Sequence, residues 1–206
     1  MLYNKHNLAV AKLASKVSGV RPVLEGVFFT KDKTVATDSY RLLEISTPAQ
    51  LVNSIPADQP LKLDDCPALK GFKPFIVNAS YLEKNIKLLT NHQGSELAGA
   101  LAVSHIFDNK VKMVYKPNQG ASFETRFIPR IVDSFPDYGK LFPTKPAVAE
   151  ITINGKMFAE MLEIVSKMAG EYTGVKIKFY GQFEPLVIEA ETKNQRARGL
   201  MMPIKN

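Results

Sequence analysis

An internal repeat constrains the fold of this chain more than any other feature. Two asparagines, Asn78 and Asn154, each follow a short apolar run and precede a stretch with helical spacing, as expected of helix N-caps. At intervals of 4, 8 and 11 residues they are followed by Leu82, Ile86 and Leu89, and by Phe158, Leu162 and Val165. The caps lie 76 positions apart (154 − 78). We interpret each as part of a strand–helix–three-strand unit; the alternative is chance recurrence of a common α+β pattern.

A looser copy of the pattern lies near the N-terminus. A helix is predicted over residues 7–17, with the same spacing of Val10, Ala14 and Val17 but without a clear asparagine cap. The sequence therefore predicts three units, over residues 1–50, 74–132 and 148–206. We expect the first two to form one domain, 1–147, with a connector at 51–73 and a linker at 133–147. The third unit, 148–206, would be half of such a domain.

The predicted class is α+β, with helices on one face of antiparallel sheets. Besides the helix at 7–17, helices are predicted over 78–89 and 154–168. Alternation and turn residues predict strands at 24–30, 34–45, 75–77, 101–108, 110–115, 122–128, 151–153, 175–180, 185–190 and 198–203.

The composition excludes several function classes. Cys66 is the single cysteine among 206 residues, and the three histidines share no metal-ligand spacing with it or with one another. The Asp64–Asp65 pair lies in the connector, where a solvated turn is the simpler explanation than a Mg²⁺ site. No nucleophile elbow or phosphate-binding glycine loop is found. We therefore expect a protein that is not an enzyme and needs no cofactor or metal. With no apolar run long enough to span a membrane, we expect a cytoplasmic location and no membrane partner.

The basic residues point to a polyanionic partner. The formal net charge is +7 and the isoelectric point about 9.4. Lysines fall off the apolar stripe of each predicted helix, where they would contact phosphates without reading bases. The alternative is an ordinary solvated helix face. The candidate DNA-binding residues are Lys12, Lys16, Lys84, Lys87, Lys156 and Lys167.

Three segments carry a resemblance to a known family. They are Ala36-Thr37-Asp38-Ser39-Tyr40-Arg41-Leu42, then Phe135-Pro136-Asp137-Tyr138 continued by Leu141-Phe142-Pro143, and Met202-Pro203-Ile204-Lys205. Their order and spacing resemble the second domain and the last half of the third domain of the bacterial DNA polymerase III beta subunit, the sliding clamp. In that family, a Gly-His pair stands where this chain has Ser39-Tyr40.

The resemblance implies a fold, a function and a site. It implies a DNA-clamp fold whose helices line a ring around duplex DNA, held without sequence preference, and hence a nucleoid-associated processivity factor. It also implies that polymerase and clamp loader bind one apolar pocket through short Leu/Phe-containing peptides. Plain core packing is the alternative for the apolar members. By resemblance, the pocket residues are Leu24, Thr37, Ser39, Tyr40, Arg41, Leu42, Pro136, Leu141, Asn154, Met157, Leu200 and Met202.

The size of the chain departs from the family pattern. The family chain has six units and closes as a dimer, so four copies of a three-unit chain would restore a ring of twelve. An odd number of units leaves one unpaired, and we expect the third unit to complete a domain with a unit from another copy. Monomeric and dimeric forms remain open. The main functional alternative is a clamp-derived partner-binding module that forms no ring around DNA. An enzyme with an unrecognised site and a generic α+β domain are the others.

Overall fold

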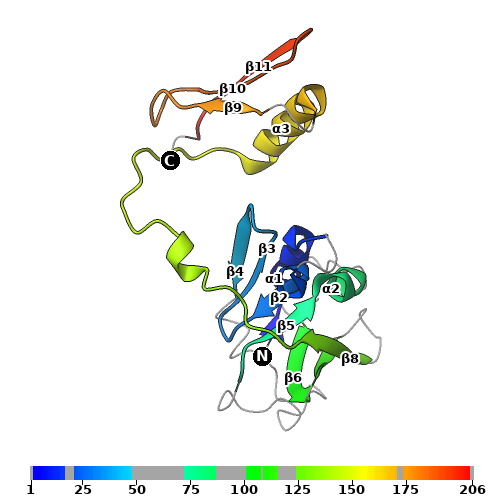
Figure 1. Ribbon diagram of the computed structural model, residues 1–206. Helices are drawn as coiled ribbons and strands as arrows, with labels where there is room; N and C mark the ends of the chain where they lie inside the picture. Colours follow the sequence, from blue (N-terminus) through cyan, green and yellow to red (C-terminus); the bar gives the residue numbers. More distant parts are fainter. Residues whose placement is uncertain are drawn as a thin grey trace. The chain divides into compact units, whose positions relative to one another are not determined.

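The computed structural model describes residues 2–16, 21–47, 72–86, 101–107, 109–115, 124–170 and 174–204. The chain divides into two compact units, Met1–Asp137 and Tyr138–Asn206, called here the N-terminal and C-terminal units (Figure 1). The predicted boundary after residue 147 falls inside the C-terminal unit so defined. The predicted connector lies almost entirely outside the described residues.

The N-terminal unit is built on an eight-stranded antiparallel sheet. The strand order is β1-β6-β7-β8-β5-β2-β3-β4. Two short helices, α1 (Lys5–Ala9) and α2 (Ala79–Ile86), lie beside each other (Figure 1). Turns of 3₁₀ helix follow α1 at Val10–Leu13 and precede β2 at Pro22–Glu25. The strands are β1 (Leu2–Tyr3), β2 (Gly26–Phe29), β3 (Lys33–Thr37), β4 (Leu42–Ser46), β5 (Phe75–Asn78), β6 (Leu101–Phe107), β7 (Lys110–Tyr115) and β8 (Glu124–Ile131).

The first repeat also begins with an asparagine cap, which the sequence pattern did not predict. Asn4, not Asn7, precedes α1, and its side chain accepts a hydrogen bond from the Asn7 backbone N–H at 3.0 Å. The Asn7 side chain in turn accepts from the Asn4 N–H at 3.1 Å, completing a reciprocal capping box. The predicted helix at 7–17 is therefore wrong in its bounds. The α-helix ends at Ala9 and tightens into a 3₁₀ turn, which shifts the later apolar positions.

The predicted strand at 34–45 is in fact two strands. β3 ends at Thr37 and β4 begins at Leu42, paired antiparallel with each other. The four residues between them form a tight turn in which Ser39 has a φ of +80°. The turn contains no glycine or proline; Asp38 and Ser39, which also favour turns, are its signal in the sequence.

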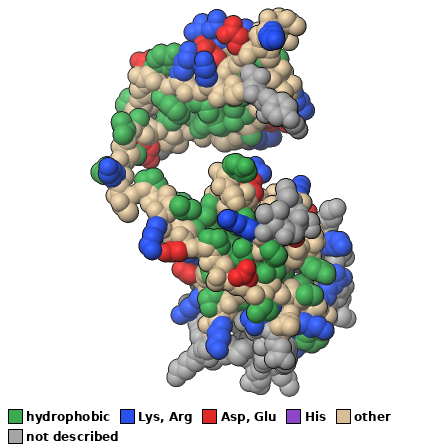
Figure 2. Space-filling model, in the orientation of Figure 1, with side chains coloured by type: hydrophobic (Ala, Val, Ile, Leu, Met, Phe, Trp, Pro, Cys, Tyr) green, Lys and Arg blue, Asp and Glu red, His purple; other side chains and the backbone are tan. Residues whose placement is uncertain are grey.

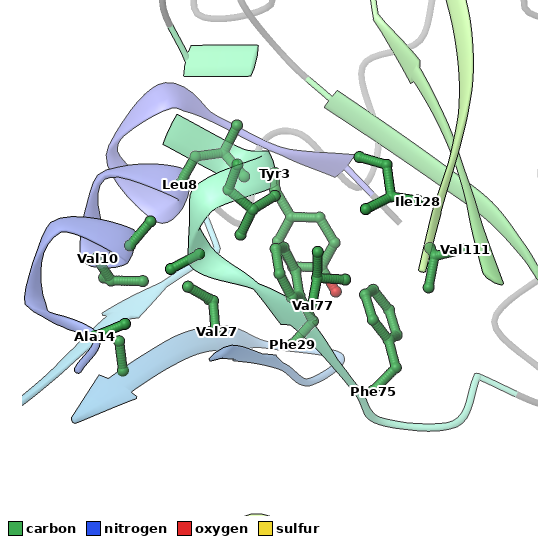
Figure 3. Close-up of a cluster of buried hydrophobic side chains, with 14 of the residues drawn as sticks. Tyr3, Leu8, Val10, Ala14, Val27, Phe29, Phe75, Val77, Val111 and Ile128 are labelled. Atoms are coloured by element: carbon green, nitrogen blue, oxygen red, sulfur yellow. The ribbon is translucent and has the colours of Figure 1, made fainter. Parts of the chain in front are cut away.

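Side chains from both repeats fill one core in the N-terminal unit. Tyr3 packs edge-to-face on Phe29, and Phe29 stacks on Phe75, with ring centroids 4.9 Å apart in each pair. Leu8 and Val10 from the helical segment point toward the sheet side chains, among them Val27 (Figure 3). These groups are almost wholly buried, so the two repeats stabilise each other by excluding water from their shared apolar faces.

The C-terminal unit has one long helix on a three-stranded sheet. Helix α3 (Gly155–Ala169) begins at the cap Asn154 and ends where Gly170 adopts a φ of +76°, as predicted. The antiparallel sheet has the order β11-β10-β9. Its strands are β9 (Lys176–Lys178), β10 (Leu186–Glu191) and β11 (Arg196–Met201).

The predicted strand at 151–153 is wrong, because these residues form no strand in the structure. Ile151 and Ile153 nevertheless pack against the core between α3 and the sheet. The members of that core include Val165, Leu186, Ile188 and Met201.

Candidate functional site

The turn between β3 and β4 is fixed by its own side chains. The Asp38 carboxylate accepts hydrogen bonds from the backbone N–H groups of Tyr40 and Arg41, each at 3.0 Å, and from the Arg41 Nε at 2.8 Å. The Thr37 hydroxyl donates to the Arg41 carbonyl at 2.8 Å. Hydrogen bonding from the Arg41 side chain lowers the pKa of Asp38 below its usual value. The turn therefore presents Tyr40, 97% exposed, on a rigid base.

Leu24 lies in a small apolar cluster rather than on a strand. The predicted strand at 24–30 begins only at Gly26, and Leu24 belongs to the preceding 3₁₀ turn. Its side chain is 8% exposed and packs with Ile76 in a cluster that also includes Phe28 and Phe135. Phe135 comes from the second motif, so Leu24 and that motif meet in one cluster. Of the neighbouring motif residues, Leu42 is partly buried and Pro136 is exposed.

The C-terminal unit exposes several large apolar side chains of the motifs. Leu141 is 72% exposed, Leu200 59% and Met202 57%. On β11, Met201 packs in the core beneath α3, so the alternation of the strand turns Leu200 to the opposite face. Exposed apolar side chains in such numbers are typical of a surface that binds another molecule. This finding disfavours the core-packing alternative for these three residues.

Asn154 acts as a helix cap in the structure. Its side chain accepts hydrogen bonds from the backbone N–H groups of Lys156 and Met157, both at 3.1 Å. Met157, in the first turn of α3, is 58% exposed. Just before the cap, the Thr152 carbonyl accepts a hydrogen bond from the Ile204 N–H at 2.8 Å. This bond ties the segment before α3 to the segment after β11.

The predicted pocket residues fall into two groups, one in each unit. The N-terminal unit holds Leu24, Thr37, Ser39, Tyr40, Arg41, Leu42 and Pro136; the C-terminal unit holds Leu141, Asn154, Met157, Leu200 and Met202. Thr37 is buried, and its hydroxyl donates the hydrogen bond to the Arg41 carbonyl that closes the turn. That both groups line one pocket stays a prediction. Phe135, which sequence reasoning placed in the motif but not in the site, is the one further residue that the structure adds.

Most predicted DNA-facing lysines are exposed. Lys12 lies in the 3₁₀ turn after α1 and Lys16 beyond its end, so they do not share one helix as expected. Lys84 is exposed on α2, and Lys156 on α3. Lys87 lies outside the described residues. Lys167 is exposed but forms an ion pair with Glu163 at 2.7 Å.

Within the described part of the chain, no three His, Cys, Asp or Glu side chains are grouped as ligands of a metal ion. Within the same residues, no helix combines the length and the apolar character needed to cross a membrane.

Known structures resemble this fold closely. No protein-family model matches the chain, and no curated protein sequence matches it. The DNA polymerase sliding clamp of Bacillus subtilis superposes with a TM-score of 0.66 at 18% identity, over 98% of this chain and 48% of the clamp. The beta subunit of DNA polymerase from Streptococcus pyogenes gives a TM-score of 0.66 at 14% identity, over 100% and 50%. The beta sliding clamp of C. crescentus gives 0.63 at 17%, over 98% and 50%.

These comparisons confirm the predicted fold class. The matched proteins are bacterial DNA polymerase III beta sliding clamps, as the three sequence motifs indicated. The chain spans about half the length of those solved structures. Its antiparallel sheets and few helices thus form an α+β fold. This chain has the fold of the bacterial beta sliding clamps, and it corresponds to about half of the length of a clamp chain.

Proposed function

We propose that this protein is a sliding clamp, a processivity factor without enzymatic activity. It would encircle duplex DNA as a homo-oligomeric ring and tether a DNA polymerase and its clamp loader through an apolar peptide-binding pocket. The observation that carries the proposal is the clamp fold together with exposed apolar side chains at the motif positions. A clamp-derived module that binds partners without forming a ring is the second candidate, because half-length coverage leaves ring closure open.

The proposed pocket would take an extended peptide with leucine or phenylalanine anchors. Leu141, Leu200 and Met202 supply exposed apolar surface, and methionine adapts its flexible side chain to differently shaped anchors. The fixed turn at Asp38–Arg41 would form a polar rim, with the exposed Arg41 guanidinium near the peptide backbone. Such a combination of apolar anchoring and few polar contacts is typical of peptide grooves.

Peptide binding tests the pocket directly. A fluorescent peptide carrying a Leu-Phe pair should bind the wild-type protein, as measured by anisotropy, and the Met202→Ser and Leu200→Ser variants should bind at least tenfold more weakly. Both side chains are more than half exposed, so the variants should keep the fold. Tyr81→Ser, which removes an exposed ring on α2, is the matched control and should bind like the wild type. Equal affinity for all four proteins would exclude this pocket.

Electrostatic contact with DNA tests the ring interior. Lys12→Glu and Lys84→Glu should weaken DNA binding and flatten its dependence on salt, because each lysine that contacts a phosphate releases a counterion. Lys31→Glu changes an exposed lysine in the turn between β2 and β3 and serves as the control. If the three charge reversals act alike, the helices have no special role in contacting DNA.

The topology of binding separates the two candidate functions. A ring assembled around a closed circular plasmid should stay bound after a high-salt wash and slide off once the plasmid is cut. A partner-binding module should be washed from both forms while still binding the peptide. Retention that does not depend on cutting would contradict encirclement.

A further inference from the structure

The two repeats of the N-terminal unit are joined by a reciprocal exchange of strands. The leading strand of the first repeat, β1, pairs with β6, the first strand after the helix of the second repeat. The leading strand of the second repeat, β5, pairs with β2, the first strand after the helix of the first repeat. The leading strand of each repeat thus pairs with a strand of the other repeat, and these two pairings make the eight-stranded sheet continuous.

The third repeat has both elements of this exchange, but neither has a partner strand among the described residues. β9 is the counterpart of β2, and it pairs only with β10. The segment before α3, Ile151–Ile153, is the counterpart of β5. β5 pairs with β8, the last strand of its own repeat, and this segment likewise bonds through Thr152 to Ile204, just beyond the last strand β11.

The burial of equivalent side chains differs accordingly. Val27 and Phe29 of β2 are fully buried, whereas all three residues of β9 are exposed, Ile177 to 40%. Ile177 pairs with Ile188, which packs in the core, so its side chain lies on the face that α3 partly covers. The edge strand therefore exposes apolar surface that its counterpart buries.

The helix positions show the same contrast. Four residues after its cap, each helix carries an apolar side chain: Leu8, Leu82 and Phe158. Leu8 and Leu82 are fully buried, because α1 and α2 pack beside each other, while Phe158 is only partly buried. Phe158 thus lacks the cover that the helix of a paired repeat gives to Leu8 and Leu82.

An apolar hollow lies beside the open edge. Its volume is about 240 Å³. The lining includes Phe179 and Tyr180, 57% and 61% exposed, which follow β9 directly. The remaining lining residues, Ala149, Glu150, Ile151 and Gly181, come from the leading segment and the turn after β9. Hydrophobic side chains gather in a band on the visible side of this unit (Figure 2).

We infer that the C-terminal unit docks with the C-terminal unit of a second copy of this chain. β9 of each copy pairs antiparallel with the leading segment, residues 149–153, of the other. The third repeat contains both partners of the exchange, β9 and the leading segment. Two copies related by a two-fold axis can therefore form both pairings at once, which leaves neither element without a partner strand. The pairing completes the leading strand that the sequence predicts at 151–153 and that one copy alone does not form.

The pairing of β2 with β5 gives the register between copies. Gly26 pairs with Asn78 and Phe29 with Phe75. A Cβ at Gly26 would collide with the Ile76 side chain of β5, whereas a Cβ at Gly174 would meet no atom within 4 Å. Gly174 is thus the open counterpart of Gly26.

Transferred to the third repeat, this register places Gly174 opposite Asn154 of the second copy and Ile177 opposite its Ile151. The next residue, Lys178, is then opposite Glu150 of the second copy. Lys178 already forms an ion pair with Glu189 of its own sheet, and Glu150 of the second copy would add a further opposite charge at the facing position.

Self-association is tested without DNA or peptide, so this inference can fail independently of the proposed function. The native mass of the full chain should rise with concentration to a dimer or a multiple of it. Ile177→Asp should weaken self-association at least tenfold while leaving peptide binding unchanged, because Ile177 is partly exposed in the single copy. Val132→Asp, at a side chain that is 66% exposed in the N-terminal unit, is the control and should assemble like the wild type.

Cross-linking tests the register. In a Cys66→Ser background, chains carrying Ile151→Cys are mixed with chains carrying Ile177→Cys and oxidised. Facing residues of an antiparallel pair lie close enough for a disulfide, so a covalent dimer is expected. Lys176→Cys, whose side chain lies on the other face of β9, should not cross-link with Ile151→Cys. A chain that is monomeric at every concentration, or equal cross-linking in both mixtures, would overturn the inference.

Discussion

Phe135 stacks face to face on Phe28, with ring centroids 4.8 Å apart and planes 5° from parallel. Phe28 belongs to β2 and Phe135 to the Phe-Pro-Asp-Tyr segment that begins the linker, so this stack fixes the point at which the linker leaves the sheet. Leu24 lies in the same cluster. The stack therefore connects the second sequence motif to β2 and to Leu24.

Phe135→Ala should loosen the start of the linker and weaken peptide binding. The ring is partly buried and stacked, so we expect a loss of roughly 1–2 kcal/mol in the free energy of unfolding, below the cost in a full core. Urea unfolding measures the stability and anisotropy measures the peptide affinity. Phe135→Leu keeps apolar volume and should recover most of the stability. If Phe135→Ala binds the peptide with unchanged affinity, the Phe28–Phe135 stack does not contribute to the binding site.

Ser39→Gly should stabilise the turn between β3 and β4. Ser39 has a φ of +80°, a conformation that costs a residue with a Cβ about 1–2 kcal/mol and that glycine adopts freely. Glycine also gains entropy in the unfolded chain, so the net gain should be roughly 0.5–1 kcal/mol in urea unfolding. Tyr40→Gly in the same turn is the control: it removes an exposed side chain without relieving strain and should destabilise slightly. Equal effects of the two substitutions would show that the turn is not strained at Ser39.

Much of the fold could be predicted because the decisive signals are local. Asn78 and Asn154 were recognisable as caps from the polar residue before a helical apolar pattern, and both cap their helices in the structure. The breaks at Asn109 and Gly170 likewise mark where strands and a helix end. Long periodic elements with clear caps can therefore be predicted from their own residues, without knowledge of tertiary contacts.

The errors arose where tertiary contacts override local pattern. Ile151–Ile153 alternates like a strand, but a strand needs a neighbour on which to form its ladder. Within the described residues of one copy, this segment pairs with no strand, although Thr152 accepts a hydrogen bond from Ile204. The turn at Ser39 was missed because its conformation is imposed by Asp38 and Thr37 rather than by glycine. For the site, the exposure of Leu200 and Met202 could not be read from sequence, because an apolar residue near a strand end is equally consistent with core.

Asn7→Leu should destabilise the N-terminal unit despite adding apolar volume. The Asn7 side chain is fully buried and donates hydrogen bonds to the carbonyls of Ile45 and Ser46, at 2.9 and 3.1 Å. Leucine would leave both partly buried carbonyls without this donor, at a cost of roughly 1–3 kcal/mol. Asn4→Ala, which removes only the cap, should cost about 1 kcal/mol. Thermal unfolding compares the two, and an equal loss would contradict the bridging role of Asn7.

Glu189 should make the C-terminal unit sensitive to acid. Its carboxylate accepts a hydrogen bond from Lys178 at 2.7 Å and lies 3.2 and 3.5 Å from the guanidinium groups of Arg198 and Arg196, so one anion joins all three strands. The hydrogen bond from Lys178, aided by these charges, lowers the pKa of Glu189 below the ordinary value of 4.5.

A lowered pKa in the folded state means that the unfolded chain takes up this proton first as the pH falls. The stabilisation is therefore present above about pH 4.5 and is lost as the pH falls through the lower pKa of the folded protein. Glu189→Gln should be less stable than the wild type at pH 7, and the gap should close as the pH falls below 4.5. Urea midpoints followed by circular dichroism across that range make the comparison. Parallel curves for the two proteins would mean that the ion cluster contributes nothing to the stability of the sheet.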